Sequence, residues 1–261
     1  MKRFVFVSGL PRAGSTLLMN VLAQNPDFHV THTSGCLDVL FGLRNQWDHL
    51  IEHRAHPLPE TKQRVLRAVL EAYHAGTDKP VVFDKSRGWL AHLEMLEEIL
   101  GGKAKVIVLV RAIPDVLASF EKLHRQTAKT AQPPGEAENY FQMQTVEGRC
   151  EYWLRPDNVL GLALNRVRDV LQRGLGDRLH FVAYEQLIME PATVMENIYG
   201  FLGEPQFAHD FDHVEQVTHE DDDLHGYAGL HTIRPKIEPR ESDAVAVLGK
   251  NLVQKYRGNL Q

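Results

Sequence analysis

The chain has 261 residues, of which 43% are hydrophobic and 24% charged, and its formal net charge is −5 at pH 7. This length and apolar content allow one large α/β domain with its own core, so we expect a single domain over residues 1–261. The slightly negative charge provides no overall basic field, which argues against nucleic acid and anionic membrane as partners.

The two cysteines, Cys36 and Cys150, lie far apart and outside any metal-ligand spacing. They fit a reducing compartment without a disulfide framework. The apolar run at 4–7 is too short for the core of a signal peptide, and no stretch approaches the ~20 apolar residues that a membrane-spanning helix needs. We therefore expect a cytoplasmic protein.

Short apolar strands alternate with helical patterns along the chain. In chain order, the pattern predicts strand 3–8, helix 15–24, a polar connection at 28–34, helices 36–52 and 59–75, strand 80–83, a helix ending at residue 100, strand 105–110, helix 114–124, a polar insertion at 127–148, helix 157–173, strand 178–184, helix 191–202 and a last helix near 242–256. This alternation predicts a three-layer α/β/α fold with a central parallel sheet. Ligands of such sheets bind beyond the carboxyl ends of the strands.

A glycine-bracketed turn follows the first predicted strand. Residues 9–16 form the pattern Gly-x-x-x-x-Gly-Ser-Thr, which is the phosphate-loop spacing with Ser15 in the position of the usual lysine. Backbone N–H groups of this turn and the positive end of the following helix dipole can bind an anion. Without the lysine, an ATP or GTP hydrolase is disfavoured, although Arg12 supplies a cation within the loop.

These residues also resemble a known family. Leu-Pro-Arg-Ala-Gly-Ser-Thr-Leu-Leu at 10–18 resembles the phosphosulfate-binding loop of sulfotransferases that use 3′-phosphoadenylyl sulfate (PAPS), most of all the protein-tyrosine and bacterial branches. The resemblance implies a P-loop-like loop that binds this co-substrate and its product, adenosine 3′,5′-bisphosphate (PAP). The loop residues implied in binding are Pro11, Arg12, Ala13, Gly14, Ser15 and Thr16.

Three later stretches resemble other nucleotide elements of the same family. Arg111 ends a predicted strand, and Ser119 lies eight residues further on, as in the 3′-phosphate site. Tyr184 begins a Tyr-Glu-x-Leu segment, so it either lies near the nucleotide or serves the core. Arg234 and Lys236 belong to a stretch, 229–236, that resembles the late basic loop of bacterial members. Arginine suits a phosphate because its charge is permanent and its hydrogen bonds are bidentate.

The resemblance implies in-line transfer of a sulfuryl group to an acceptor hydroxyl or amine, with fixed cations around the developing charge. Arg12 and Lys85 are the catalytic cations that we expect, and no metal is required. For the general base we predict His32, with His29 and Asp84 as alternatives.

Five histidines at 209, 213, 219, 225 and 231 lie near an acidic run at 220–223. Their spacing fits no zinc motif, so we expect an acidic, solvated loop there.

The acceptor is expected to be a small molecule or a peptide. The segments 35–75 and 127–155 match no nucleotide element, and we interpret them as insertions on the acceptor side. A homodimer is compatible with the sequence. Two other functions remain open: a kinase of small molecules or nucleotides, which would require Mg²⁺ and ATP, and a non-catalytic module that binds PAP.

Overall fold

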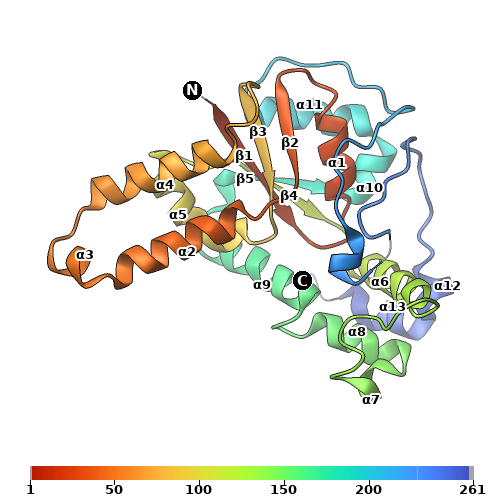
Figure 1. Cartoon of the computed structure of the whole chain (residues 1–261). Helices are drawn as coiled ribbons and strands as arrows, with labels where there is room; N and C mark the ends of the chain where they lie inside the picture. The colour runs from red at the N-terminus through yellow and green to blue at the C-terminus, as the bar shows by residue number, and fades with distance from the viewer. Residues whose placement is uncertain (1, 228, 259–261) are drawn as a thin grey trace.

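The computed structural model describes residues 2–227 and 229–258. Its centre is a five-stranded parallel sheet in the order β2-β3-β1-β4-β5, with helices on both faces (Figure 1). The three-layer α/β/α prediction is therefore confirmed. The strands are β1 Arg3–Gly9, β2 Phe28–Thr33, β3 Val81–Lys85, β4 Val106–Val110 and β5 Leu179–Ala183.

The predicted helices are found to within a few residues of their predicted bounds, although the one predicted near 242–256 is divided in two at Gly249, and helices over 140–143, 146–154 and 184–189 were not predicted. All helices of the described residues follow in chain order. They are α1 Ser15–Leu22, α2 Cys36–His49, α3 Ile51–Ala55, α4 Pro59–Tyr73, η1 Trp89–His92, α5 Leu93–Leu100, α6 Ile113–Thr127, α7 Tyr140–Met143, α8 Val146–Leu154, α9 Val159–Gln172, η2 Gly176–Arg178, α10 Tyr184–Met189, α11 Pro191–Leu202, η3 Asp222–His225, α12 Ala244–Leu248 and α13 Lys250–Arg257. The helix predicted for 36–52 is interrupted at Leu50, whose ψ of 127° is extended.

The central strand β1 divides the core into two. Val5 and Val7 belong to the cluster that includes residues of α1, α6 and α11. Phe4 and Phe6 belong to the cluster formed with α2, α4 and α5. Successive side chains of a strand point to opposite faces of its sheet, so a strand that is apolar on both faces must lie between two helical layers.

The segment 28–34 is an edge strand, which corrects the prediction of a polar connection. Residues Phe28–Thr33 form β2, which pairs in parallel with β3. Only Phe28 is fully buried, while the later residues are half-buried or exposed. An edge strand with one partner buries little apolar surface, so its polar side chains conceal the strand pattern, although Val30, Thr31 and Thr33 have the β-branched side chains that strands favour.

The two segments interpreted as insertions have different structures. Helices α2 and α4 lie side by side and extend away from the sheet, with α3 at their far end (Figure 1). Leu40, Leu66 and Leu70 pack the base of this arm against the core. Helix α8 packs instead against α6, and α7 packs against α8. Within the described residues, no helix combines the length and the apolar character needed to span a membrane.

Candidate functional site

At two positions of the loop between β1 and α1, the backbone requires a residue without a side chain. Gly9 has φ 124°, and a Cβ atom there would lie 2.1 Å from the carbonyl oxygen of Leu109. Gly14 has φ 87°, and its Cβ would lie 2.7 Å from the Tyr184 ring. Arg12 has φ 59°, which is uncommon for a residue with a side chain. Such strain concentrates at ligand-binding sites, and here it shapes the turn that the sequence predicted.

Helix α1 begins directly at this turn, with Gly14 as its N-cap. No side chain caps the helix, because glycine has none to offer. The first N–H groups of an α-helix lack acceptors within the helix, and its dipole is positive at this end. The loop and the first turn of α1 therefore form an anion site of the phosphate-loop kind.

Arg12 and Arg111, from distant parts of the sequence, meet at this loop. The Nη1 of Arg111 donates a hydrogen bond to the carbonyl oxygen of Arg12, at 3.0 Å. Burial and then the nearby charge of Arg111 lower the pKa of Arg12 to about 10, so the Arg12 guanidinium remains charged at neutral pH. Two cations held this close to each other favour an anionic ligand.

Further contacts fix the orientation of both arginines. Arg12 Nε donates to Ser119 Oγ at 3.0 Å, and its Nη1 donates to the carbonyl oxygen of Leu230. The Arg111 guanidinium lies 4.2 Å from the centre of the Tyr184 ring. Arg111 Nε is buried and has no hydrogen-bond partner among the described residues. A buried donor without a partner is costly, so this atom is a candidate contact for a ligand.

A cavity of about 680 Å³ opens at this loop. Eleven of the residues predicted for the site line it: Pro11, Arg12, Gly14, Ser15, Thr16, Lys85, Arg111, Ser119, Tyr184, Arg234 and Lys236. Ala13 does not line it, because its side chain belongs to the core. Arg234 and Lys236 are exposed, and Lys236 pairs with Asp212 at 2.8 Å. The phosphate loop and the late basic loop thus share one cavity.

Lys85 is the last residue of β3, and its side chain is buried against Glu220. Their charged atoms lie 3.0 Å apart, and the two side chains are 8% and 6% exposed. Burial opposes ionisation of Glu220, but Lys85 and the hydrogen bonds from Thr33 outweigh it and lower the carboxyl pKa to about 2. Glu220 is therefore ionised, and the acidic run is not solvated throughout, which corrects the sequence prediction.

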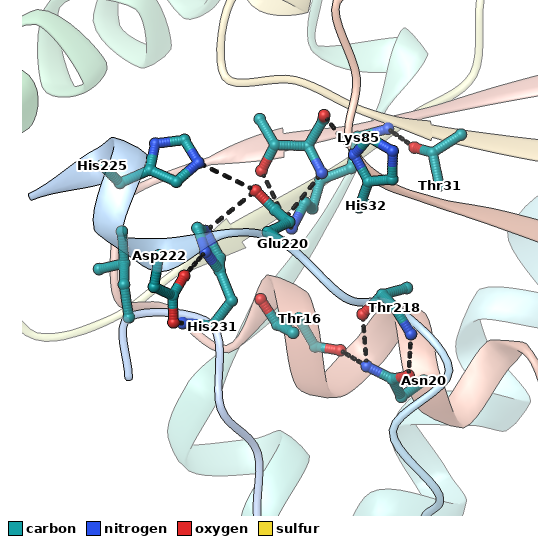
Figure 2. A network of polar contacts seen from close by, with 12 residues as sticks. Thr16, Asn20, Thr31, His32, Lys85, Thr218, Glu220, Asp222, His225 and His231 are labelled. Atoms are coloured by element: carbon teal, nitrogen blue, oxygen red, sulfur yellow. Dashed lines mark hydrogen bonds and ion pairs between the residues drawn. The ribbon is translucent and has the colours of Figure 1, made fainter. Parts of the chain in front are cut away.

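Residues that follow Glu220 in the sequence lie beside its carboxylate. Asp222 accepts a hydrogen bond from His231 Nδ1 at 2.6 Å. His225 and His231 line the cavity, and Figure 2 shows both rings pointing towards the Glu220 carboxylate. Sequence reasoning noticed these histidines and acids but could not place them, because the residues are irregularly spaced and only the folded loop brings them together.

The three residues predicted as the general base lie outside the cavity lining that the structure describes. His32 is exposed, and its Nδ1 lies 2.7 Å from the carbonyl oxygen of Thr33. It is not among the described residues that line the cavity, and neither is His29. Asp84 is fully buried on the other side of β3, where it accepts a hydrogen bond from Trp89 Nε1 at 2.8 Å. Asp84 therefore points to the opposite face of the sheet from Lys85, which lines the cavity.

The fold and the site define an α/β protein with a phosphate-type loop. Ser15 stands in the position of the usual lysine, and the cations at the loop are Arg12 and Arg111. Residues 5–209 match the sequence pattern of the sulfotransferase family. This match covers more than half of the chain, so the chain belongs to the sulfotransferase family. A comparison with curated proteins found no match.

Sulfotransferases of known structure share the fold. One is the "Sulfotransferase Domain from the Curacin Biosynthetic Pathway", at 17% identity and a TM-score of 0.59, covering 100% of this chain and 98% of the other. Another is mouse sulfotransferase SULT7A1 complexed with PAP, at 12% identity and a TM-score of 0.52, covering 98% and 82%. At such identities, the likeness concerns the fold alone.

Proposed function

We propose that this protein transfers a sulfuryl group from PAPS to an acceptor hydroxyl or amine. The observation that carries the proposal is that Arg12 and Arg111 converge on one cavity at the N-terminus of α1. PAPS carries anionic groups at two positions of its ribose, the 3′-phosphate and the 5′-phosphosulfate, so its site needs two cationic regions that one small molecule can reach. The mouse relative with PAP bound is consistent with this choice of nucleotide.

The residues present fit this co-substrate. The amides of the loop and the first turn of α1, together with Arg12, would hold the phosphosulfate. Arg111, with its unpartnered Nε, and Ser119 would hold the 3′-phosphate, with Arg234 and Lys236 beside them. These groups are positioned before a ligand arrives, which is the condition under which fixed donors stabilise developing charge most effectively.

Lys85 is the second cation that we propose near the transferring group. Lys85 lines the same cavity as the phosphate loop, and Glu220 holds its Nζ. When bound, PAPS supplies an activated sulfuryl group, and Lys85 and Arg12 would offset the negative charge that the transferring sulfonate retains. The proton of the acceptor needs a base, for which His32 stays a prediction.

The acceptor would approach from the side of segment 127–155. Pro134, Tyr152 and Trp153 of this segment line the cavity. The arm at 35–75 contributes instead to a second hollow of about 320 Å³, lined by Leu37, Asp38 and Phe41 and sharing Thr33, Ser86 and Arg87 with the first. Aromatic and polar side chains at the large cavity are compatible with a small molecule or a peptide side chain.

Thermal unfolding in the presence of nucleotides tests the proposal. PAP should raise the melting temperature without Mg²⁺, because the site provides its own cations. ATP should raise it much less, since the loop lacks the lysine that contacts the terminal phosphates. An equal response to both nucleotides, or one that requires Mg²⁺, would favour a kinase instead. Labelled-sulfate transfer from PAPS to a panel of acceptors then separates an enzyme from a module that only binds PAP.

A further inference from the structure

We propose that Glu220, His225 and His231 bind a divalent transition-metal ion of the zinc class. One oxygen and two imidazole nitrogens converge: Glu220 Oε2 lies 3.3 Å from His225 Nε2 and 3.6 Å from His231 Nε2. All three ligand atoms lie within 4.8 Å of one another. Ligands of a tetrahedral zinc ion lie about 3.3 Å apart, since zinc–ligand distances are about 2.0–2.2 Å. The spacing in the structure is therefore close to that of a metal site.

The hydrogen bonds around His231 leave one ring nitrogen for a metal. Asp222 Oδ1 lies 2.6 Å from His231 Nδ1, so this nitrogen carries a proton that it donates to the carboxylate. In the neutral ring, the lone pair is then on Nε2, which faces Glu220 (Figure 2). A carboxylate that holds the outer nitrogen of a ligating histidine is the usual support of protein metal sites.

Glu220 is held in place through one carboxylate oxygen, and its other oxygen is available to a metal ion. Its Oε1 accepts hydrogen bonds from Lys85 and from the backbone N–H and hydroxyl of Thr33. Its Oε2 faces the two histidines. An unprotonated nitrogen and a carboxylate oxygen repel each other unless a cation lies between them. A divalent metal between these atoms would accept electron pairs from all three and so satisfy them together.

The donor set indicates the class of metal. Two imidazole nitrogens and one carboxylate suit zinc and its transition-metal neighbours, whereas Mg²⁺ and Ca²⁺ prefer oxygen ligands. His225 and His231 both line the cavity, so the open fourth position would face it. Because Arg12 also holds the Leu230 carbonyl, the ion would fix His225 and His231 beside the phosphate loop. This inference goes beyond the proposed transfer reaction.

Cobalt titration of the full chain tests the site. After treatment with a chelator, the protein should bind one Co²⁺ per chain with the visible absorption bands of tetrahedral cobalt, and Zn²⁺ should displace it while Mg²⁺ does not. His225→Ala and His231→Ala should abolish the bands. Asp222→Asn should weaken the affinity about 10–100-fold, because Asp222 only orients a ligand. His225 is 43% exposed in its side chain, so its removal should leave the metal-free fold intact.

His213→Ala is the matched control, because His213 also pairs with an aspartate, Asp210, but is 84% exposed. This variant should bind Co²⁺ as the wild type does. The proposal is wrong if the wild type shows no tetrahedral bands, if both cavity variants keep them, or if the control loses them. PAP binding is measured on chelator-treated protein, so a failure here would not affect the nucleotide test, nor the reverse.

Discussion

Two buried ion pairs of this protein differ in how completely their charges are satisfied. Glu121 of α6 is fully buried, and Arg149 of α8 donates to both of its oxygens at 2.7 Å. Arg125 adds a third bond, and Arg149 Nη1 donates to the carbonyl oxygen of Met143. The pair of Lys85 and Glu220 has one ionic contact at 3.0 Å, and Lys85 lines the cavity.

The difference separates a structural role from a functional one. A buried pair whose hydrogen bonds are all made holds its two helices together and has nothing left for a ligand. The pair at the cavity leaves Glu220 Oε2 without a strong partner of its own and leaves Lys85 on the wall. A ligand can therefore replace part of this second pair, and the following variants test the comparison.

The largest effect is expected at the satisfied pair. Glu121→Gln leaves the Arg149 charge buried without a counter-charge, and breaking such a pair costs about 3–5 kcal/mol of unfolding free energy. Urea denaturation measures this loss. Glu147→Gln is the matched control, because Glu147 forms an exposed pair with Lys255; it should change stability little. Equal losses in the two variants would show that Glu121 and Arg149 do not form a stabilising buried pair.

The pair of Glu121 and Arg149 also predicts that the free energy of unfolding depends on pH. Burial raises the pKa of the Glu121 carboxyl, but hydrogen bonds from Arg149 and Arg125 outweigh burial and leave the pKa below its usual value. A carboxyl with a lowered pKa stabilises the fold above its unfolded pKa of about 4.3 and loses this contribution as the pH falls through the folded pKa. Wild-type stability should therefore fall more steeply in acid than that of Glu121→Gln.

A smaller effect, on the rate of transfer and not on stability, is expected at the open pair. Lys85→Ala removes a fixed cation from the cavity and should slow labelled-sulfate transfer by about 10²–10³-fold, or roughly 2.7–4 kcal/mol. PAP affinity should change little, because Lys85 is proposed to act on the transferring group. Lys103→Ala, at an exposed pair with Asp177, serves as the control. A rate for Lys85→Ala equal to that of the control would remove its catalytic role.

The smallest of the three effects is expected for binding at Arg111. Arg111→Ala should weaken PAP binding by roughly 1.5–3 kcal/mol, the range of hydrogen bonds to a charged group. Calorimetric titration of PAP measures this change. Arg67→Ala is a matched control, because Arg67 also lies over an aromatic ring, at 5.7 Å from the centre of Phe4, but outside the cavity lining. Unchanged affinity in Arg111→Ala would contradict the 3′-phosphate assignment.

Local signals in the sequence were sufficient for much of the fold. The apolar strand at 106–110 and the glycine pattern at 9–14 are set by neighbouring residues, and both appear in the structure as predicted. The family was likewise visible in the loop at 10–18 and is confirmed by the match over 5–209. The edge strand β2 was missed because its side chains are partly exposed, so burial did not impose an apolar pattern.

Some residues of the site could likewise be predicted from local signals, and others could not. Arg12 and Arg111 could be predicted because each follows a strand of a parallel sheet, and strand ends of one sheet meet at one edge. By itself, the sequence thus determined four of the five strands, the loop and the two cations. Only the tertiary structure decided that Glu220 lies buried against Lys85 and that His225 and His231 join it. These contacts arise in a segment whose described residues form only the short 3-10 helix η3, where no repeating pattern encodes which side chains meet.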